Sequence, residues 1–413
     1  MAILRAFKGI RPVKDKVKLI ASKPYDVLSS AEARIEAKDD PYSFLHVVKP
    51  EIDLSPDVDH YSPLVYEKGR ENFCKMVNEG LYFKDEKNQL YIYALTMNGK
   101  RQIGLVGCAG VEDYMNGVIK KHELTRPDKE EDRKNHIRIS NLNYEPVFFA
   151  YPDNQEIDRI VNEVIKGDSE YDFVSNDGIR HTFWVIKDDD TIGPLTNLFK
   201  KIPYTYVADG HHRTAAAALV GYERKQQNPN HIGTEEYNFF LAVHFPATQL
   251  TILDYNRVVK DLNGLSESEF LKKLQKNFIL EQKGENEYRP DKLHNFGMYM
   301  NMKWYSLTAK NGIYDKNDPI DVLDVTILYK NVLLPILNIA DLRTDKRIEF
   351  VGGIRGLAEL EKRVDSGEMK AAFALYPVSM KQLMYIADTD NIMPPKTTWF
   401  EPKLRSGLIV HKL

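Results

Sequence analysis

Alternating apolar and polar residues, interrupted by turn residues, predict strands over much of the first 260 positions. Residues 89–111, QLYIYALTMNGKRQIGLVGCAGV, carry the clearest pattern, because two β-rich runs flank Asn98-Gly99, the strongest short hairpin signal. The runs HTFWVIKD at 181–188 and EYNFFLAVHFPATQLTILDYNRVV at 236–259 predict three more strands. Together these runs favour a fold with at least one substantial sheet.

Helical patterns alternate with these strands. Residues 17–37 predict a short strand, a Pro-Tyr-Asp turn and a helix that Ser29 or Ser30 can cap. Residues 111–141 predict charged helix, broken near Pro127. Residues 319–337 predict one long apolar helix, and residues 349–378 predict strand, glycine turn, helix and strand. This mixture predicts an α/β or α+β chain.

Residues 201–227, KIPYTYVADGHHRTAAAALVGYERKQQ, predict a strand, a tight turn and a helix. The strand ends near Val207, Asp209-Gly210 makes the turn, and the alanine run strongly favours helix. His211, His212 and Arg213 therefore fall in the first helical turn. Unpaired amides and the helix dipole make such a turn an anion site.

The side chains of this turn suggest how an anion would bind. Arg213 adds a planar fork that matches phosphate oxygens, and Gly210 allows the backbone to approach a ligand closely. Asp209 does not fit a pure anion pocket. A carboxylate beside phosphate is more naturally a ligand for Mg²⁺ or a base that acts on a hydroxyl.

Composition narrows the functional classes. The chain has 413 residues, of which 43% are hydrophobic and 28% charged, and its net charge of -3 argues against a protein that mainly grips nucleic-acid backbone. No apolar run approaches the roughly 20 residues that span a bilayer. The two cysteines form no spacing motif, and the N-terminal residues lack a signal-peptide pattern. We therefore expect a cytoplasmic protein without a membrane partner.

Several segments resemble one family when taken together. ADGHHR between a strand and an alanine-rich helix resembles the phosphate-binding turn of the ParB/sulfiredoxin-like superfamily, and is more similar still to the domain of unknown function 1015 family. Residues 7–33 resemble that family's opening, residues 117–133 its His-Glu-x-Thr stretch, and residues 393–408 its closing segment. The family is in turn similar to free-serine kinases, which transfer a nucleotide phosphate to the hydroxyl of L-serine.

The resemblance implies a fold and a domain organisation. It implies a ParB/sulfiredoxin-like mixed-sheet core over residues 1–255 that binds a nucleotide, with a large insert at about 55–200. A C-terminal α/β region with a packed tail would occupy residues 256–413.

The resemblance also implies an activity. It implies a nucleotide-dependent phosphotransferase that uses ATP or ADP with Mg²⁺ and acts on a small hydroxyl metabolite, with free L-serine as one candidate. Gly210, His211 and Arg213 would hold the phosphates, Asp209 and His212 would take part in catalysis, and Asp209 would hold the metal ion. The base in the similar kinases is an early glutamate, whose counterpart here is Asp26, Glu32 or Glu36.

A second polar cluster lies at KKHELTRPDKEEDR. A helix that begins near Pro127 places Lys129 and Arg133 on one face. A solvated helix with internal ion pairs is one interpretation of this charge run. The other is a lid or second anion-binding element, to which His122, Glu123, Thr125, Lys129 and Arg133 would contribute.

Other motifs give weaker signals. The 11 histidines include no His-x-x-x-His pair and the cysteines no Cys-x-x-Cys pair, so zinc is not expected and Mg²⁺ is favoured. The glycine turn at 350–356 lacks the spacing of a nucleotide-binding loop. In the tail, Lys396, Lys403 and Arg405 could bring cations to a ligand, or the tail could pack across a domain face.

Two alternative functions stay open. The same pocket could bind a nucleotide as a regulatory or scaffold switch without any transfer. A ParB-like DNA-associated protein would need a basic recognition helix, and the sequence offers no convincing helix-turn-helix. The oligomeric state does not follow from the sequence.

Overall fold

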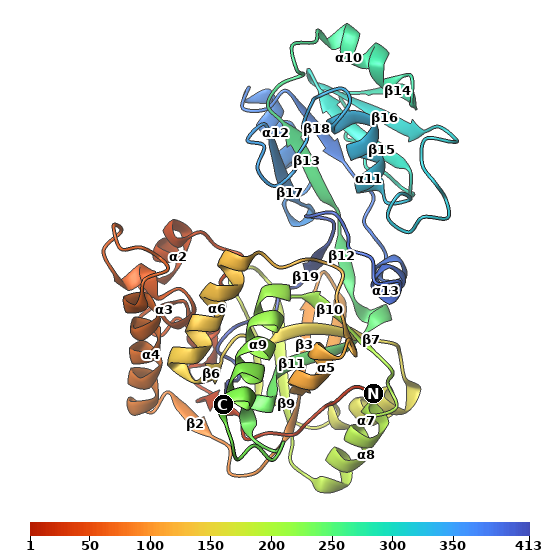
Figure 1. Cartoon of the computed structure of the whole chain (residues 1–413). Coiled ribbons are helices and arrows are strands. Elements are labelled where there is room, and N and C mark those ends of the chain that lie inside the picture. The colour runs from red at the N-terminus through yellow and green to blue at the C-terminus, as the bar shows by residue number, and fades with distance from the viewer. The chain divides into compact units, whose positions relative to one another are not determined.

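The computed structural model describes all 413 residues and confirms the mixed α/β class (Figure 1). The chain forms two compact units. The first comprises Met1–Leu250 together with Pro402–Leu413, and the second comprises Thr251–Glu401. None of the helices is long and apolar enough to cross a bilayer.

An eight-stranded mixed sheet forms the centre of the first unit. Its order is β5-β10-β7-β11-β4-β3-β9-β8, and only the β10–β5 and β11–β7 pairs are parallel. The strands are β3 (Leu90–Met97), β4 (Lys100–Gly110), β5 (Ile119–Lys120), β7 (Val147–Tyr151), β8 (Tyr171–Val174), β9 (Arg180–Ile186), β10 (Thr205–Asp209) and β11 (Phe239–Pro246).

One face of this sheet carries a continuous row of buried side chains, four of them apolar. Cross-strand neighbours share a face, and register places five buried residues side by side across β7, β11, β4, β3 and β9: Phe149, His244, Leu105, Ile92 and Trp184. Helices pack on this face in two groups. Alanines of α9 (His211–Gln227) pack against β7, β10 and β11 in one hydrophobic cluster. Helices α7 (Gln155–Val164) and α8 (Asp189–Phe199) pack against β3, β4 and β9 in a second cluster.

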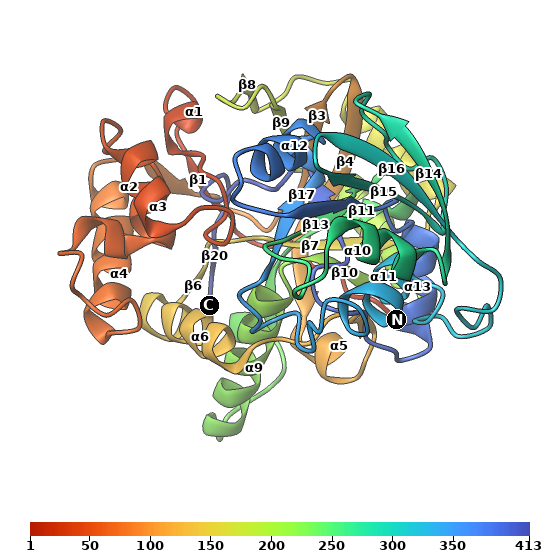
Figure 2. The ribbon, with the colours of Figure 1, turned by 90° about the horizontal axis from the view of Figure 1, so that it is seen from above.

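The remaining helices of the first unit lie beside these groups. Helix α6 (Pro127–Ser140) runs next to α9, as Figures 1 and 2 both show. The others are α1 (Val17–Ile20), α2 (Ser30–Ala37), α3 (Leu45–Val48), α4 (Pro63–Asn78) and α5 (Val111–Met115), with 3₁₀ turns η1 (Pro50–Asp53), η2 (Glu236–Asn238) and η3 (Ala247–Gln249). Helices α2, α3 and α4 share a core with Ile10 of β1, Tyr82 of β2 and Val410 of the C-terminal tail.

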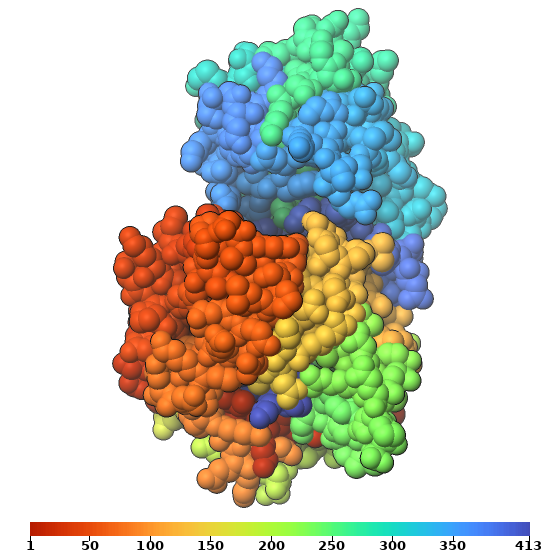
Figure 3. All heavy atoms as spheres, turned by 60° about the vertical axis from the view of Figure 1, so that its left-hand side comes forward, coloured from red at the N-terminus to blue at the C-terminus, as the bar shows by residue number.

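The C-terminal tail returns to the first unit. Two short sheets pair β1 (Ile10–Pro12) with β2 (Tyr82–Lys84), and β6 (Leu142–Asn143) with β20 (His411–Lys412). Residues before β20 are also buried, and Leu408, Ile409 and Val410 are each at most 3% exposed. Figure 3 shows the last residues, in blue, reaching the surface between α6 and the N-terminal segments.

A six-stranded antiparallel sheet forms the second unit, in the order β14-β16-β15-β18-β13-β17. Its strands are β13 (Tyr255–Val259), β14 (Phe278–Gly284), β15 (Asn295–Met300), β16 (Lys303–Ala309), β17 (Ile348–Gly352) and β18 (Ala371–Ala374), and β12 (Thr251–Leu253) pairs with β19 (Trp399–Glu401). The helices are α10 (Glu267–Leu274), α11 (Asp324–Leu328), α12 (Ala358–Asp365) and α13 (Met380–Asp388), with a π-helical turn at Tyr329–Leu333 and a 3₁₀ turn at Gly353–Arg355.

Most predicted elements are confirmed. The β3–β4 hairpin turns at Asn98 and Gly99, which both have positive φ (51° and 78°), as a type I′ turn requires. Ser29 caps α2 in a capping box with Glu32. The glycine turn at 350–356 joins β17 to α12 through a 3₁₀ turn, in agreement with a plain connection.

Two predicted elements are wrong. Residues Val17–Ile20 form a helical turn instead of a strand, because Val17 and Ile20 bury one face at a spacing of three. The long apolar helix at 319–337 is short, because the Asp318 side chain accepts hydrogen bonds from the amides of Ile320 and Asp321 and keeps that segment in a turn.

The observed division of the chain also differs from the expected organisation. The expected boundary after residue 255 lies close to the observed one after Leu250, but the tail belongs to the first unit. The stretch expected to be an insert, 55–200, supplies β3, β4, β5, β7, β8 and β9, so it builds most of the main sheet. The sequence predicted strands at 89–111 and 181–188 but not their place in the main sheet, because strand pairing joins residues that lie far apart in the chain.

Candidate functional site

The turn between β10 and α9 has the predicted form. Asp209 ends the strand, and Gly210 takes a left-handed conformation with φ of 88°. Helix α9 begins at His211 without any side-chain cap, so its first amides lack helical partners. The alanine run that follows is buried, with Ala215, Ala216, Ala217 and Ala218 at most 7% exposed. The small side chains bring α9 close to the sheet and fix the position of its first turn.

Arg213 lies beneath this turn and is only 5% exposed. Its Nη1 donates to the carbonyl oxygen of Pro146 at 2.9 Å, and its Nη2 donates to Asp209 Oδ2 at 2.8 Å. The guanidinium covers Gly210, where an added Cβ would lie 3.0 Å from Arg213 Nε. The fork expected to face phosphate therefore faces the protein. Arg213 supplies positive charge behind the turn and holds the turn in shape.

Asp209 is held between two cations. Besides Arg213, it accepts a hydrogen bond from Lys403 Nζ to Oδ1 at 2.7 Å. Burial alone would raise its pKa, but Lys403 and Arg213 prevail and lower the pKa to about 2. Both carboxylate oxygens are thus engaged, and a carboxylate with so low a pKa is a weak base for a hydroxyl proton. Lys403 comes from the C-terminal tail, which places that segment in the site.

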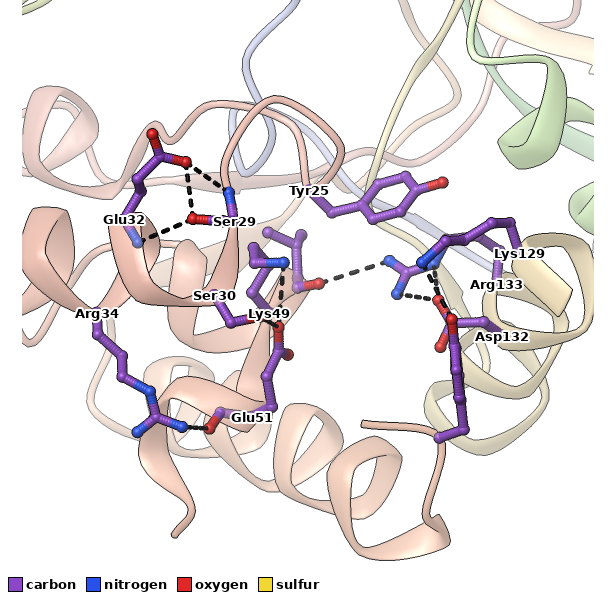
Figure 4. Close-up of polar contacts among 12 residues, drawn as sticks. Tyr25, Ser29, Ser30, Glu32, Arg34, Lys49, Glu51, Lys129, Asp132 and Arg133 are labelled. Carbon is purple, nitrogen blue, oxygen red and sulfur yellow. Dashed lines mark hydrogen bonds and ion pairs between the residues drawn. The ribbon is translucent and has the colours of Figure 1, made fainter. Parts of the chain in front are cut away.

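Of the early carboxylates, the structure brings Asp26 to the turn. Asp26 Oδ2 lies 3.8 Å from Arg213 Nη2, and its side chain is 41% exposed. Glu32 instead accepts hydrogen bonds from the amide and hydroxyl of Ser29 at the start of α2 (Figure 4). Glu36 pairs with Lys23 at 2.8 Å. The folded chain therefore separates candidates that the sequence could not distinguish.

The two adjacent histidines, His211 and His212, make different contacts. His212 Nε2 accepts a hydrogen bond from the amide of Arg126 at 3.0 Å, which ties the loop before α6 to the α9 turn. Burial lowers the His212 pKa, and the Asp26 carboxylate opposes that shift. His211 points to the His-Glu-x-Thr stretch: its ring contacts the His122 ring edge to face, with centroids 4.4 Å apart.

The rest of the His-Glu-x-Thr stretch lies beside the turn as well. Glu123 Oε2 is 3.9 Å from His211 Nδ1, and the Thr125 hydroxyl donates to Glu130 Oε2 at 2.8 Å. Helix α6 begins at Pro127, as predicted. The segment thus connects the start of α9 to the start of α6.

Lys129 and Arg133 of α6 line a cavity of about 250 Å³. The cavity is also lined by residues of both charges and by two tyrosines: Tyr25, Lys49, Glu51, Asp59, His60, Tyr61, Asp132 and His136, with Val48. Figure 4 shows Lys49 and Glu51 facing Arg133 and Asp132 across this space, and Tyr25 beside it. The predicted common face of Lys129 and Arg133 is thus the face that lines a cavity.

Arg133 is fully engaged at the floor of this cavity. Its guanidinium pairs with Asp132 at 2.8 Å and Glu145 at 3.2 Å, and lies 3.9 Å from the centre of the Tyr25 ring. Lys129 Nζ donates to the Tyr61 hydroxyl at 3.1 Å. Buried Arg133 therefore acts as a support, whereas Lys129 is partly exposed.

Several charged residues of this region were not predicted from the sequence. Glu145 is 8% exposed, and burial raises its pKa although Arg133 opposes the shift. Glu51 pairs with Lys49 at 3.1 Å and accepts from the Ser30 hydroxyl at 2.7 Å. None of these residues belongs to a recognisable motif. The one available signal was an isolated acid, Glu145, two residues before the apolar strand β7.

Comparisons with known proteins place the chain in a family. No curated protein matches. Among solved structures, the chain is similar to a free serine kinase in complex with AMP, with 12% identity over 72% of this chain and 86% of that chain and a TM-score of 0.36. It is also similar to a conserved hypothetical protein from Pyrococcus furiosus (13% identity, 73% and 93% coverage, TM-score 0.34) and to SbnI with a C-terminal truncation from Staphylococcus aureus (12%, 72% and 82%, TM-score 0.32). The family model described as "Protein of unknown function (DUF1015)" matches residues 4–326, and the chain therefore belongs to that family.

Proposed function

We propose that the protein transfers a phosphoryl group from ATP or ADP to the hydroxyl of a small metabolite. The observation that carries the proposal is the place of Asp26. Its half-exposed carboxylate lies 3.8 Å from Arg213 at the start of α9, and the preceding residue, Tyr25, lines the cavity beside α6. A carboxylate between an anion-binding turn and a small polar cavity is positioned to take a proton from an acceptor hydroxyl.

The phosphates bind at the first turn of α9. Uncapped amides and the positive end of the helix dipole attract an anion, and Arg213 holds the turn in shape from behind. This differs from the bidentate contact expected from the sequence, because the fork of Arg213 is occupied by Pro146 and Asp209. Mg²⁺ arrives mainly on the phosphate oxygens, since it prefers oxygen ligands and retains several waters.

The cavity beside α6 receives the acceptor. Its volume of about 250 Å³ is below the roughly 300–1,000 Å³ typical of sites for drug-sized molecules, so it suits an amino acid better than a nucleotide. Lys49 and Lys129 can meet a carboxylate, and Glu51 and Asp59 can meet an ammonium group. This lining favours a small zwitterion with a hydroxyl group, and free L-serine is the simplest example.

The test combines turnover with nucleotide binding. The full chain is incubated with ATP or ADP, Mg²⁺ and L-serine, L-threonine, L-homoserine or glycerol, with L-alanine as an acceptor that lacks a hydroxyl. Phosphorus NMR should detect a new phosphomonoester with at least one hydroxyl acceptor and none with L-alanine. The absence of both turnover and nucleotide binding in calorimetry would contradict the proposal.

Two matched variants locate the base. Asp26→Asn should lower turnover about 100-fold or more and leave nucleotide affinity within about threefold, because a general base acts on the chemical step. Glu32→Gln should stay near the wild-type rate, because glutamine can still complete the capping box with Ser29. Nucleotide binding without turnover by the wild-type chain would instead select the regulatory or scaffold alternative.

A further inference from the structure

Three buried ring nitrogens that make no hydrogen bond of normal geometry lie next to the α9 turn. His122 is 1% exposed and His211 is 7% exposed. Neither nitrogen of His122 makes a hydrogen bond of normal geometry, and His211 Nε2 has no partner. Buried polar atoms normally find hydrogen-bond partners, so the grouping of these atoms at one place calls for a physical reason.

A carboxylate completes the group. One ligand atom from each of His122, Glu123 and His211 lies within 4.8 Å of the other two. Glu123 is the most exposed of the three, at 39% for its side chain, and lies 3.9 Å from His211 Nδ1. Two imidazoles and one carboxylate are a common donor set for a divalent transition metal.

We infer that His122, Glu123 and His211 bind a divalent transition metal ion of the zinc class. The donor set excludes Mg²⁺ as the preferred ion, because Mg²⁺ takes oxygen ligands whereas imidazole suits zinc, cobalt and iron. Three protein ligands leave a position for water, as in open zinc sites. This site is separate from the Mg²⁺ that the nucleotide would carry, and it does not depend on the proposed function.

The three ligand atoms lie within 4.8 Å of one another, a wider spacing than an ion would require. Ligand atoms around a tetrahedral ion lie about 3.3 Å apart when each bond is about 2.0–2.1 Å, so the cluster must contract. Rotation of the half-exposed Glu123 side chain can supply much of that movement.

The sequence-based expectation that zinc is absent rested on local spacing. The two histidines belong to different elements, since His211 opens α9 whereas His122 follows β5. The β5–β10 pairing brings them together, with Thr205 opposite Ile119 and Tyr206 opposite Lys120. No local motif search could detect such a pair.

The test uses the untagged full chain. After treatment with a chelator, it is titrated with Co²⁺ and followed by visible absorption. One equivalent should bind and give the bands of four- or five-coordinate cobalt, and Zn²⁺ should displace it. Glu123→Gln should weaken Co²⁺ binding at least tenfold, and His122→Gln should abolish the bands.

A matched histidine separates this site from general effects of buried histidines. His244 is also 1% exposed and has two ring nitrogens without partners, but it packs between Phe149 and Phe199. His244→Gln should keep the wild-type cobalt spectrum. Absence of stoichiometric Co²⁺ binding by the wild type would overturn the inference. So would unchanged binding in Glu123→Gln, a variant at a half-exposed position that should fold even if His122→Gln does not.

Discussion

Arg213 donates to Asp209 at 2.8 Å across a single turn of chain, and the guanidinium closes over Gly210 between them. The contact explains why an acid, a glycine and an arginine occur so close together. The arginine neutralises the acid, the glycine leaves room for the guanidinium, and the start of α9 is held with its amides uncapped. The pair is therefore a support for the anion-binding turn.

Gly210→Ala tests the support. The left-handed φ of 88° strains any other residue, and the new Cβ would approach Arg213 within about 3 Å. We expect a loss of about 2–3 kcal/mol in the free energy of unfolding. Gly178 provides the control, because it has φ of 78° but nothing within 4 Å of an added Cβ. Gly178→Ala should cost about 1 kcal/mol, as measured by urea unfolding; equal losses would show that Arg213 does not crowd the turn.

Asp209→Asn should destabilise the protein in a pH-dependent way. The folded-state pKa of Asp209 is about 2, below its ordinary value of 3.8, so its ionisation stabilises the fold above pH 4 and the effect disappears as pH falls through 2. We expect a deficit of about 2 kcal/mol at pH 6 that shrinks toward pH 2.5. Unfolding measured from pH 2.5 to 7 checks this, with exposed Asp39→Asn as the control. A deficit independent of pH would contradict the ion pair.

Asp324, in the second unit, should give the free energy of unfolding the opposite pH dependence. It is 3% exposed, its Oδ1 accepts from the amide of His294 at 2.8 Å, and its Oδ2 has no partner. Burial raises its pKa to about 7, against 3.8 ordinarily. The folded state therefore keeps a proton that the unfolded state has lost. Stability should fall by up to about 4 kcal/mol as pH rises from 4 to 7.

Asp324→Asn should remove this loss, because asparagine imitates the protonated acid. Calorimetric melting should give nearly equal stability for the wild type and Asp324→Asn at pH 4, and a more stable variant at pH 8. Exposed Asp291→Asn is the control and should follow the wild type. A wild-type stability that does not decline over this range would show that Asp324 is ionised in the folded state.

Local chemistry determined what the sequence could predict. Asn98-Gly99 and Asp209-Gly210 are turns for reasons contained in a few residues, and both were predicted correctly. Contacts between distant residues were not predictable. Lys403 reaches Asp209 across 194 positions, and only folding shows that Asp26 approaches Arg213 whereas Glu32 caps its own helix. The role expected for Arg213 changed for the same reason, because Pro146 occupies half of its fork.

The central claim is that nucleotide phosphates bind at the first turn of α9, and calorimetric titration of the full chain with ADP and Mg²⁺ tests it most directly. His212→Glu places a negative charge at that turn, where the helix dipole favours it, so the fold should be kept while the phosphates are repelled. Exposed Gln226→Glu adds the same charge at the far end of α9. We predict one-site binding by the wild type and by Gln226→Glu, and at least about tenfold weaker binding by His212→Glu. No binding by the wild type, or equal affinity in all three proteins, would contradict the claim.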